Sequence, residues 1–133
     1  MNLNKAELIG NLTADPTSRE LPSGQKVASF QIATSYVWRD AKSKERQETT
    51  DFHHVLAWGR LADVVAKYLK KGDRVYIDGR LHNRTWSDKS GSKQVRMEIV
   101  IRNLIMLGGR KKHEDNVEKV EKEVMEAVES REG

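Results

Sequence analysis

One short stretch with helical spacing divides this chain, and it constrains the fold more than any other feature. Within residues 61–69 the apolar side chains recur at intervals of three or four, at Leu61, Val64, Val65, Tyr68 and Leu69. This spacing is typical of one buried face of an α-helix. Two lysines and Gly72 follow, as is common where a helix ends. Three segments that alternate apolar and polar residues precede this helix, and two follow it.

The five alternating segments predict strands, because side chains of an extended chain point to its two faces in turn. They cover residues 3–13, 27–37, 50–59, 73–86 and 95–107. Gly79 lies inside the fourth segment, where a glycine indicates a β-bulge or a sharp bend. Five strands with one helix between the third and the fourth follow the order of the OB-fold. We therefore expect an all-β fold, a five-stranded Greek-key barrel of this type.

Three connections are expected to be irregular. A loop begins at Asp15 and Pro16 and reaches a turn at residues 21–24, where proline and glycine suit a tight reversal. Residues 39–49 carry seven charged side chains without an apolar period, which predicts a solvated, mobile loop. Residues 87–91 are expected to form the hairpin loop between the last two strands.

Charge divides the chain into two unequal parts. Residues 113–133 contain eight acidic and three basic residues, a net charge of −5, whereas residues 1–112 contain 21 basic and 12 acidic residues, a net charge of +9. We expect an OB-fold domain at residues 1–110 and an acidic tail at 111–133. A basic body favours a polyanionic partner such as nucleic acid. An acidic tail either competes for that basic surface or serves as a handle for a protein partner.

The tail has a narrow apolar stripe at helical spacing, formed by Val117, Val120, Val124, Ala127 and Val128. An isolated helix of about two heptads is marginal in water, so it needs a surface to pack against. Two states stay open for the tail: a packed helix, or a solvated helical or disordered segment.

Composition excludes several classes of site. The chain has no cysteine, so it has no disulfide framework or thiolate zinc site, and a reducing compartment is natural. The first residues, MNLNKAELIGNL, include no long apolar segment, so a cytoplasmic location is expected.

No metal, cofactor or catalytic centre is expected. His53 and His54 are adjacent and point to opposite faces of a strand, and no further ligands follow at metal-site spacing. A Gly-rich phosphate loop, a nucleophile elbow and paired carboxylates on one strand are all missing from the sequence. The pattern indicates a protein that is not an enzyme.

An aromatic row lies on one face of the third predicted strand. Alternation places Phe52, His54 and Trp58 on one side and the apolar Val55 and Ala57 on the other. Such a row either stacks on flat ligands such as nucleobases or packs against another subunit. We interpret His54 as facing outward toward nucleic acid and His53, on the opposite parity, as a structural or subunit-interface residue.

Basic residues accompany each of the three tryptophans. Trp38 is followed by Arg39, Arg60 lies two residues after Trp58, and Arg84 lies two residues before Trp86. One such tryptophan alone would be a core residue more often than a ligand contact. Three of them, together with Phe52, favour a platform on which bases stack while neighbouring cations contact phosphates.

Five stretches, taken together, carry a family resemblance. They are NLNKAELIGNLTADP, LPSGQKVASFQIATS with WRD, TDFHHVLAWGRLADVVAKYLKKGDRVYIDGRL, RTWSDKSG and MLGG, within about residues 2–109. They resemble the bacterial single-stranded DNA-binding protein (SSB) family. The resemblance implies a homotetramer of OB domains in the cytoplasm, associated with the nucleoid. It also implies sequence-tolerant binding of single-stranded DNA in replication, recombination and repair.

The resemblance also implies roles for individual residues. Base stacking is expected of Trp38, Phe52, Trp58 and Trp86. Phosphate contacts are expected of Arg19, Arg39, Arg60, Lys71, Arg84 and Arg96. His54 stands where the family usually has a basic residue, which raises the question of a pH dependence. Leu8 and His53 match positions that join subunits.

The end of the chain departs from the family pattern. Family members usually continue with a Gly-, Pro- or Gln-rich linker and an acidic Pro-Phe tip that recruits replication and repair proteins, whereas this chain continues with HEDNVEKVEKEVMEAVESREG. Recruitment of such partners is therefore possible but not expected through that tip. Two other functions stay open. One is an OB-fold replication-restart accessory that acts mainly as a protein-interaction module. The other is an OB-fold enzyme, which would need carboxylates clustered in one pocket.

Overall fold

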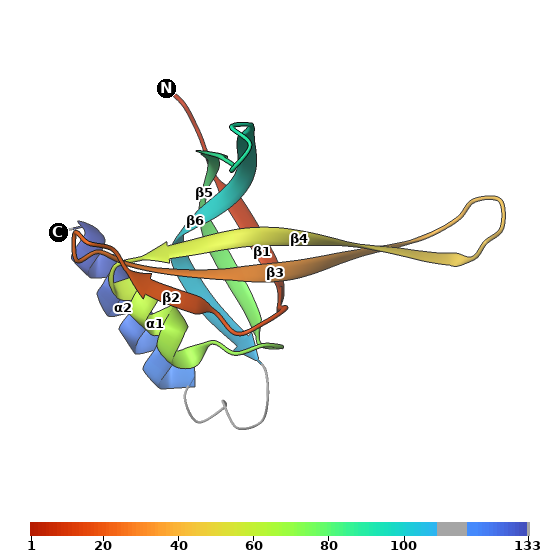
Figure 1. The fold of residues 1–133 in the computed structure, drawn as a ribbon. Coiled ribbons are helices and arrows are strands. Elements are labelled where there is room, and N and C mark those ends of the chain that lie inside the picture. The colour runs from red at the N-terminus through yellow and green to blue at the C-terminus, as the bar shows by residue number, and fades with distance from the viewer. Residues whose placement is uncertain (109–116, 133) are drawn as a thin grey trace.

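Five long strands close into a barrel in the computed structural model, which describes residues 1–108 and 117–132 (Figure 1). The strands are β1 (Ala6–Leu12), β3 (Lys26–Arg39), β4 (Arg46–Trp58), β5 (Arg74–Ser87) and β6 (Lys93–Gly108). They pair in the order β1-β5-β6-β4-β3, and β1 pairs with β3 to close the barrel. Only β4 and β6 run parallel among these pairs.

Helix α1 (Arg60–Tyr68) lies between the third and fourth of the five long strands. Gly59, with φ of 64°, turns the chain from β4 into the helix in a conformation that favours glycine. The apolar face of α1 is buried against the barrel, as the spacing predicted, with Leu61, Val64, Val65 and Tyr68 in the core. The strand order and the helix position confirm the OB-fold.

Alternate residues of the strands point into the barrel, which confirms the prediction of which β4 side chains face the core. Val55 and Ala57 are fully buried, whereas Phe52 on the other parity is 57% exposed. Gly79 is also confirmed as the site of a bulge, because the β5–β6 register shifts between Asp78 and Gly79. A Cβ atom at Gly79 would overlap the carbonyl oxygen of Val100, so only glycine lets the two strands approach there.

Two expectations for the connections are wrong. The loop predicted after Asp15 contains a short strand, β2 (Thr17–Glu20), which pairs with the beginning of β3. The loop predicted over residues 39–49 is limited to residues 40–45, because β4 already begins at Arg46 and continues the ladder with β3. Both strand segments are held by backbone pairing and are largely exposed, so no apolar alternation marks them in the sequence.

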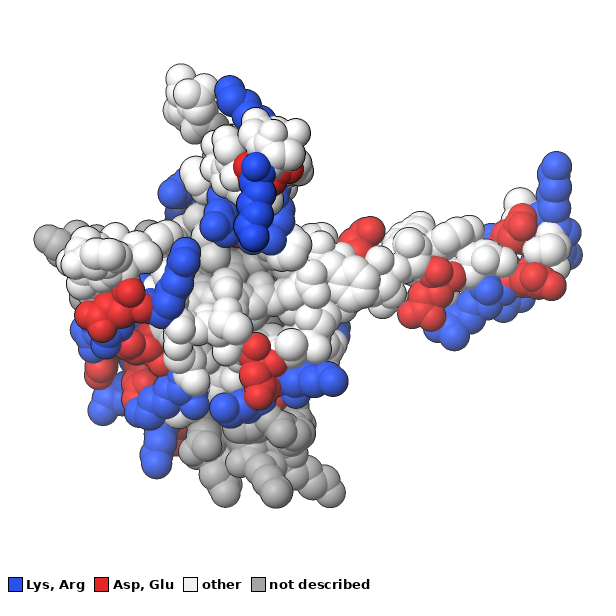
Figure 2. Space-filling view, viewed as in Figure 1, with Lys and Arg blue, Asp and Glu red and all other residues white. Residues whose placement is uncertain are grey.

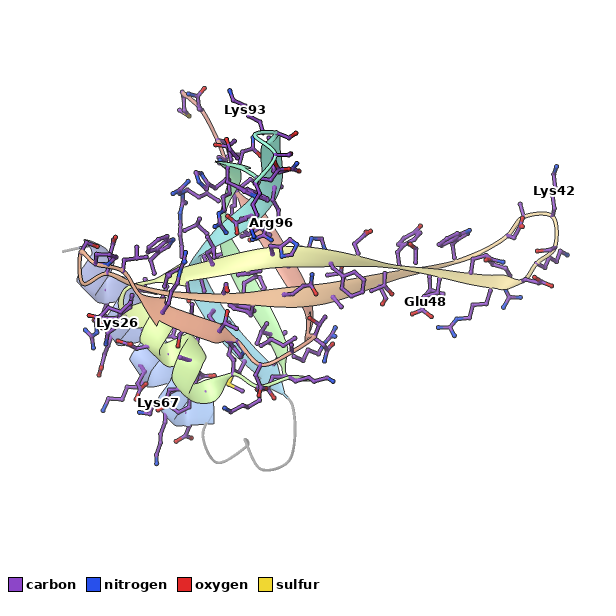
Figure 3. All side chains as sticks on the ribbon, viewed as in Figure 1. Lys26, Lys42, Glu48, Lys67, Lys93 and Arg96 are labelled. Atoms are coloured by element: carbon purple, nitrogen blue, oxygen red, sulfur yellow. The ribbon has the colours of Figure 1, made fainter. Side chains whose placement is uncertain are left out.

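The outer halves of β3 and β4 form a two-stranded ribbon that projects far from the barrel (Figure 1). We call this the ribbon and define it as residues 34–39 and 46–51. Lys42 lies at its tip (Figure 3).

Residues 117–132 form helix α2 (Val117–Glu132), which packs on α1 and β6. The predicted stripe faces the core: Val120, Val124 and Ala127 are buried and Val128 is partly buried. The packed helix is therefore the alternative that this part of the chain adopts. Within the described residues, no helix is long and apolar enough to cross a membrane. The domain boundary expected at residue 110 lies outside the described residues and stays a prediction.

Candidate nucleic-acid interface

Two adjoining hollows lie on the outward face of β2, β3, β4, β6 and β5. Their volumes are about 270 and 330 Å³, and they share Thr17, Ser29 and Arg96 in their walls. Arg19, Leu56 and Arg84 also line the first hollow, and Gln31, His54 and Glu98 line the second. We call this surface the groove.

Cross-strand rows explain why these residues meet, since directly paired residues share a face of the sheet. Thr17 pairs with Ser29, and Ser29 pairs with Leu56. One row further, Gln31 pairs with His54, and His54 pairs with Glu98 of the parallel strand β6. The hydrogen bond between the Thr17 and Ser29 hydroxyls, 2.8 Å long, ties β2 to this face.

The strongest combination of charge and aromatic surface lies on the β5–β6 hairpin. Arg84 and Arg96 are direct cross-strand partners. Their guanidinium carbons lie 5.6 and 5.8 Å from the centre of the Trp86 ring, within cation–π range. Trp86 is still 39% exposed. One flat apolar surface and two positive charges are therefore available together.

Basic side chains gather on this hairpin, whereas acidic and basic side chains mix along the ribbon (Figure 2). Arg96 lies where the hairpin meets the barrel (Figure 3).

Trp58 lies beside the groove on the same face. Val27 pairs with Arg19 on one side and with Trp58 on the other, so Arg19 and Trp58 flank it in one row. Phe52 lies two residues before His54 on β4, so its side chain also points outward. Of the predicted residues, the structure thus brings Arg19, His54, Trp58, Arg84, Trp86 and Arg96 together, with Phe52 at the margin.

Trp38 lies apart from this set. It is 41% exposed on the ribbon and stacks on Tyr36, with ring centres 5.8 Å apart and an angle of 25° between planes. Its partner across the ladder is Gln47, whereas Phe52 pairs with Ala33. Residues 38 and 33 have opposite parity on β3, so Trp38 and Phe52 face opposite sides of the ribbon.

Three predicted phosphate contacts also lie outside the groove. Arg39 pairs with Arg46 at the outer end of the ribbon. Arg60 begins α1 and lies 3.7 Å from the Glu126 carboxylate of α2. Lys71 lies in the turn before β5, where its backbone N–H donates to the Asp15 carboxylate over 2.8 Å.

His54 has a pKa below its ordinary value. Partial burial disfavours its charged form most, and the positive charge of Arg96 adds to this, while the Glu98 carboxylate opposes it. His53, on the other side of β4, is half-buried, and its Nε2 atom lies 2.7 Å from the Thr34 hydroxyl in a hydrogen bond.

Sequence reasoning missed Glu98. Alternation correctly placed it on the polar parity of β6, but its side chain is only 1% exposed. It pairs with Arg96, with 3.2 Å between Nη2 and Oε2. The sequence has no signal for this burial, because an exposed and a buried glutamate at such a position look alike.

A second surface lies on the outer side of β1, β5 and β6. Ile9, Tyr76 and Ile105 pair across these strands in one row, and Ile9 and Ile105 are 49% and 38% exposed. Leu8, on the inward parity, packs against the barrel core instead. The interface roles of Leu8 and His53 stay predictions.

Within residues 1–108 and 117–132, no group of three or more His, Cys, Asp or Glu side chains is arranged to hold a metal ion.

Strand order and groove together define an OB-fold binding domain. The profile described as the single-strand binding protein family matches residues 3–107, and the chain belongs to this family. It is 50% identical over 109 residues to single-stranded DNA-binding protein 1 of Chlorobaculum tepidum, covering 81% of this chain and 67% of that protein.

Two solved structures are also similar. The Plasmodium falciparum SSB complex with ssDNA has a TM-score of 0.73 at 36% identity, with 81% of this chain and 97% of that chain covered. A deletion mutant of the single-stranded DNA binding protein from Thermus aquaticus has a TM-score of 0.69 at 32% identity, with 81% and 52% covered.

Proposed function

We propose that this protein binds single-stranded DNA without catalysis and with little sequence preference, and that it does so in replication, recombination and repair. The observation that carries the proposal is the exposed Trp86 ring, which lies beside Arg84 and Arg96 at the groove. The relatives support it, since one is named a single-stranded DNA-binding protein and a similar structure is an SSB complex with ssDNA.

Binding begins with electrostatic attraction in this mechanism. The basic residues of the groove neutralise phosphates and release the counterions that these phosphates had condensed. Bases then stack on Trp86 and Trp58, which contributes about 1–3 kcal/mol per base. Every base has a flat face, so stacking of this kind is tolerant of sequence.

A fluorescence titration with oligo-dT at low salt tests the proposal. We expect quenching of tryptophan fluorescence, and an affinity that falls with salt at a log–log slope near −0.7 for each phosphate neutralised. A duplex of the same length serves as the control ligand. Absence of quenching at low salt would contradict the proposal and favour the protein-interaction module instead.

We also propose a homotetramer in the cytoplasm, associated with the nucleoid. The row of Ile9, Tyr76 and Ile105 supports self-association, because its two isoleucines are exposed and apolar side chains on an outer sheet face are stabilised when another subunit covers them. Sedimentation with and without single-stranded DNA measures both the subunit number and the DNA stoichiometry. A species with the mass of a single chain at all concentrations would contradict the tetramer.

A further inference from the structure

The groove contains a buried negative charge where a polyanion is proposed to bind. Glu98 is 1% exposed and lies in the wall of the larger hollow. Asp15 lines the same hollow but is exposed and accepts a backbone hydrogen bond from Lys71. Burial of a charged carboxylate is costly unless a charged partner holds it. The presence of Glu98 therefore needs a physical reason.

Arg96 is the charged partner of Glu98. The Arg96 Nη2 atom donates to Glu98 Oε2 over 3.2 Å. Glu98 Oε1 and Arg96 Nε are both buried, with no hydrogen-bond partner among the described residues. The other ionisable residues paired directly with Glu98 are His54 on β4 and His82 on β5. The carboxylate thus depends mainly on Arg96, and its oxygen holds one end of the guanidinium group.

Arg96 occupies the central position of the groove. It lines both hollows, and its side chain is still 38% exposed. Its guanidinium shares the Trp86 ring with that of Arg84. Two like charges at one ring repel each other, and the Glu98 carboxylate offsets this repulsion on the Arg96 side. An arginine held at one nitrogen loses less conformational freedom when it binds a phosphate.

We propose that Glu98 is a positioning residue for DNA binding: it fixes the Arg96 guanidinium beside Trp86, so that one phosphate and one stacked base are bound together. This inference rests on the proposed function. It reverses the expectation from net charge alone, because removal of a negative charge from a groove that binds a polyanion would otherwise strengthen binding.

The variant Glu98→Gln distinguishes the two expectations. Glutamine has the same shape but no charge, so its hold on Arg96 is weaker. We expect affinity for oligo-dT to fall by roughly tenfold. The log–log salt slope should become shallower by about 0.7, the value for one phosphate contact. Unchanged or tighter binding at an unchanged slope would overturn the inference.

The matched control is Asp51→Asn, which removes one negative charge from an exposed residue. Asp51 pairs with Thr34, and this pair lies on the opposite face of the sheet from the groove. We expect equal or slightly tighter binding in this variant. If the control weakens binding as much as Glu98→Gln does, the effect is not specific to Arg96 and the inference fails.

A double-variant cycle locates the effect. Arg96→Gln should weaken binding, and adding Glu98→Gln to it should cause no further loss, because a positioning residue acts only through its partner. Additive losses would contradict the inference.

Glu98→Asp keeps the charge but shortens the side chain. This variant serves as the test of positioning if Glu98→Gln does not fold. Weaker binding by a folded aspartate variant, verified by thermal unfolding, supports positioning; unchanged binding overturns it. Failure of the wild-type protein to bind oligo-dT at all would instead overturn the proposed function, so the two failures are distinguishable.

Discussion

Trp86 is the residue at which base stacking and phosphate contacts are proposed to occur together. Two guanidinium groups lie within 5.8 Å of its ring centre, and the residue is still 39% exposed. Trp86→Ala should weaken oligo-dT binding by roughly ten- to a hundredfold, because one base–aromatic stack contributes about 1–3 kcal/mol. Anisotropy of a labelled oligonucleotide measures this without relying on the deleted fluorophore. Trp38→Ala, on the far side of the ribbon, should cause a smaller loss. The reverse order would contradict the assignment of the groove.

We expect DNA binding to depend on pH through His54. Its pKa is lowered, first by burial and then by the charge of Arg96, with Glu98 opposing and His53 adding slightly. Phosphates bound nearby favour the protonated ring, so affinity should rise as pH falls, and the rise should continue below the ordinary histidine pKa of about 6.5 because the His54 pKa of the free protein is lowered. His54→Gln should remove most of this rise, as measured by titrations at constant ionic strength. An equally steep profile in the variant would assign the effect to another group.

The same lowered pKa predicts the sign of a stability effect. As pH falls below about 6.5, the unfolded chain binds a proton at residue 54 before the folded chain does. The free energy of unfolding is therefore highest above this value and decreases as pH falls toward and through the folded-state pKa. Urea denaturation of the wild type and His54→Gln over this pH range should show a smaller decrease in the variant. A larger decrease in the variant would contradict the shift.

At the scale of elements, α2 both completes the core and pairs with basic residues of α1. Val120 and Val124 are buried against the barrel, and Glu123 accepts hydrogen bonds from Lys67 at 3.1 Å and from the Tyr68 hydroxyl at 2.8 Å. Deletion of residues 113–133 should lower the melting temperature, because it exposes the apolar surface that these valines cover. It should also tighten DNA binding at low salt, because an acidic segment no longer competes for the basic surface.

A substitution separates the two effects of α2. Glu126→Gln removes the carboxylate that lies 3.7 Å from Arg60 but leaves the apolar face of the helix intact. We expect slightly tighter oligo-dT binding at low salt, no difference at high salt and an unchanged melting temperature. If the deletion tightens binding and this variant does not, the competition does not involve Arg60.

Elements were predictable from the sequence where one of their faces is buried. The alternation in β3, β4 and β5 and the spacing in α1 all reflect contact with one core, so their patterns are visible in the chain. β2 and the first residues of β4 are stabilised by backbone hydrogen bonds to β3 while their side chains are exposed. Such pairing is independent of side-chain polarity, so no period in the sequence indicates it.

At the scale of the whole molecule, the outer face of β1, β5 and β6 is the surface with which we expect subunits to associate. Ile105 is 38% exposed beside Tyr76, whose pKa is raised to about 12 by partial burial and by its hydrogen bond to Glu7. Ile105→Glu should convert the proposed tetramer into smaller species in sedimentation, since a charge buried in an interface without a partner is costly. Circular dichroism of the variant should stay that of a folded barrel. A tetramer that persists would locate the interface elsewhere.

The barrel, the helix between its third and fourth long strands and the apolar stripe of α2 could all be predicted from the amino-acid sequence. Each of these depends on periodic contact with a core, and periodicity is a property of the chain alone. Which of the predicted site residues lie close together became known from the three-dimensional structure. It gathers Arg19, Arg84, Trp86 and Arg96 around one groove, and it places Trp38 on the far side of the ribbon. It also buries Glu98 against Arg96. Such contacts depend on strand register and on the order of strands around the barrel, which bring together residues far apart in the chain.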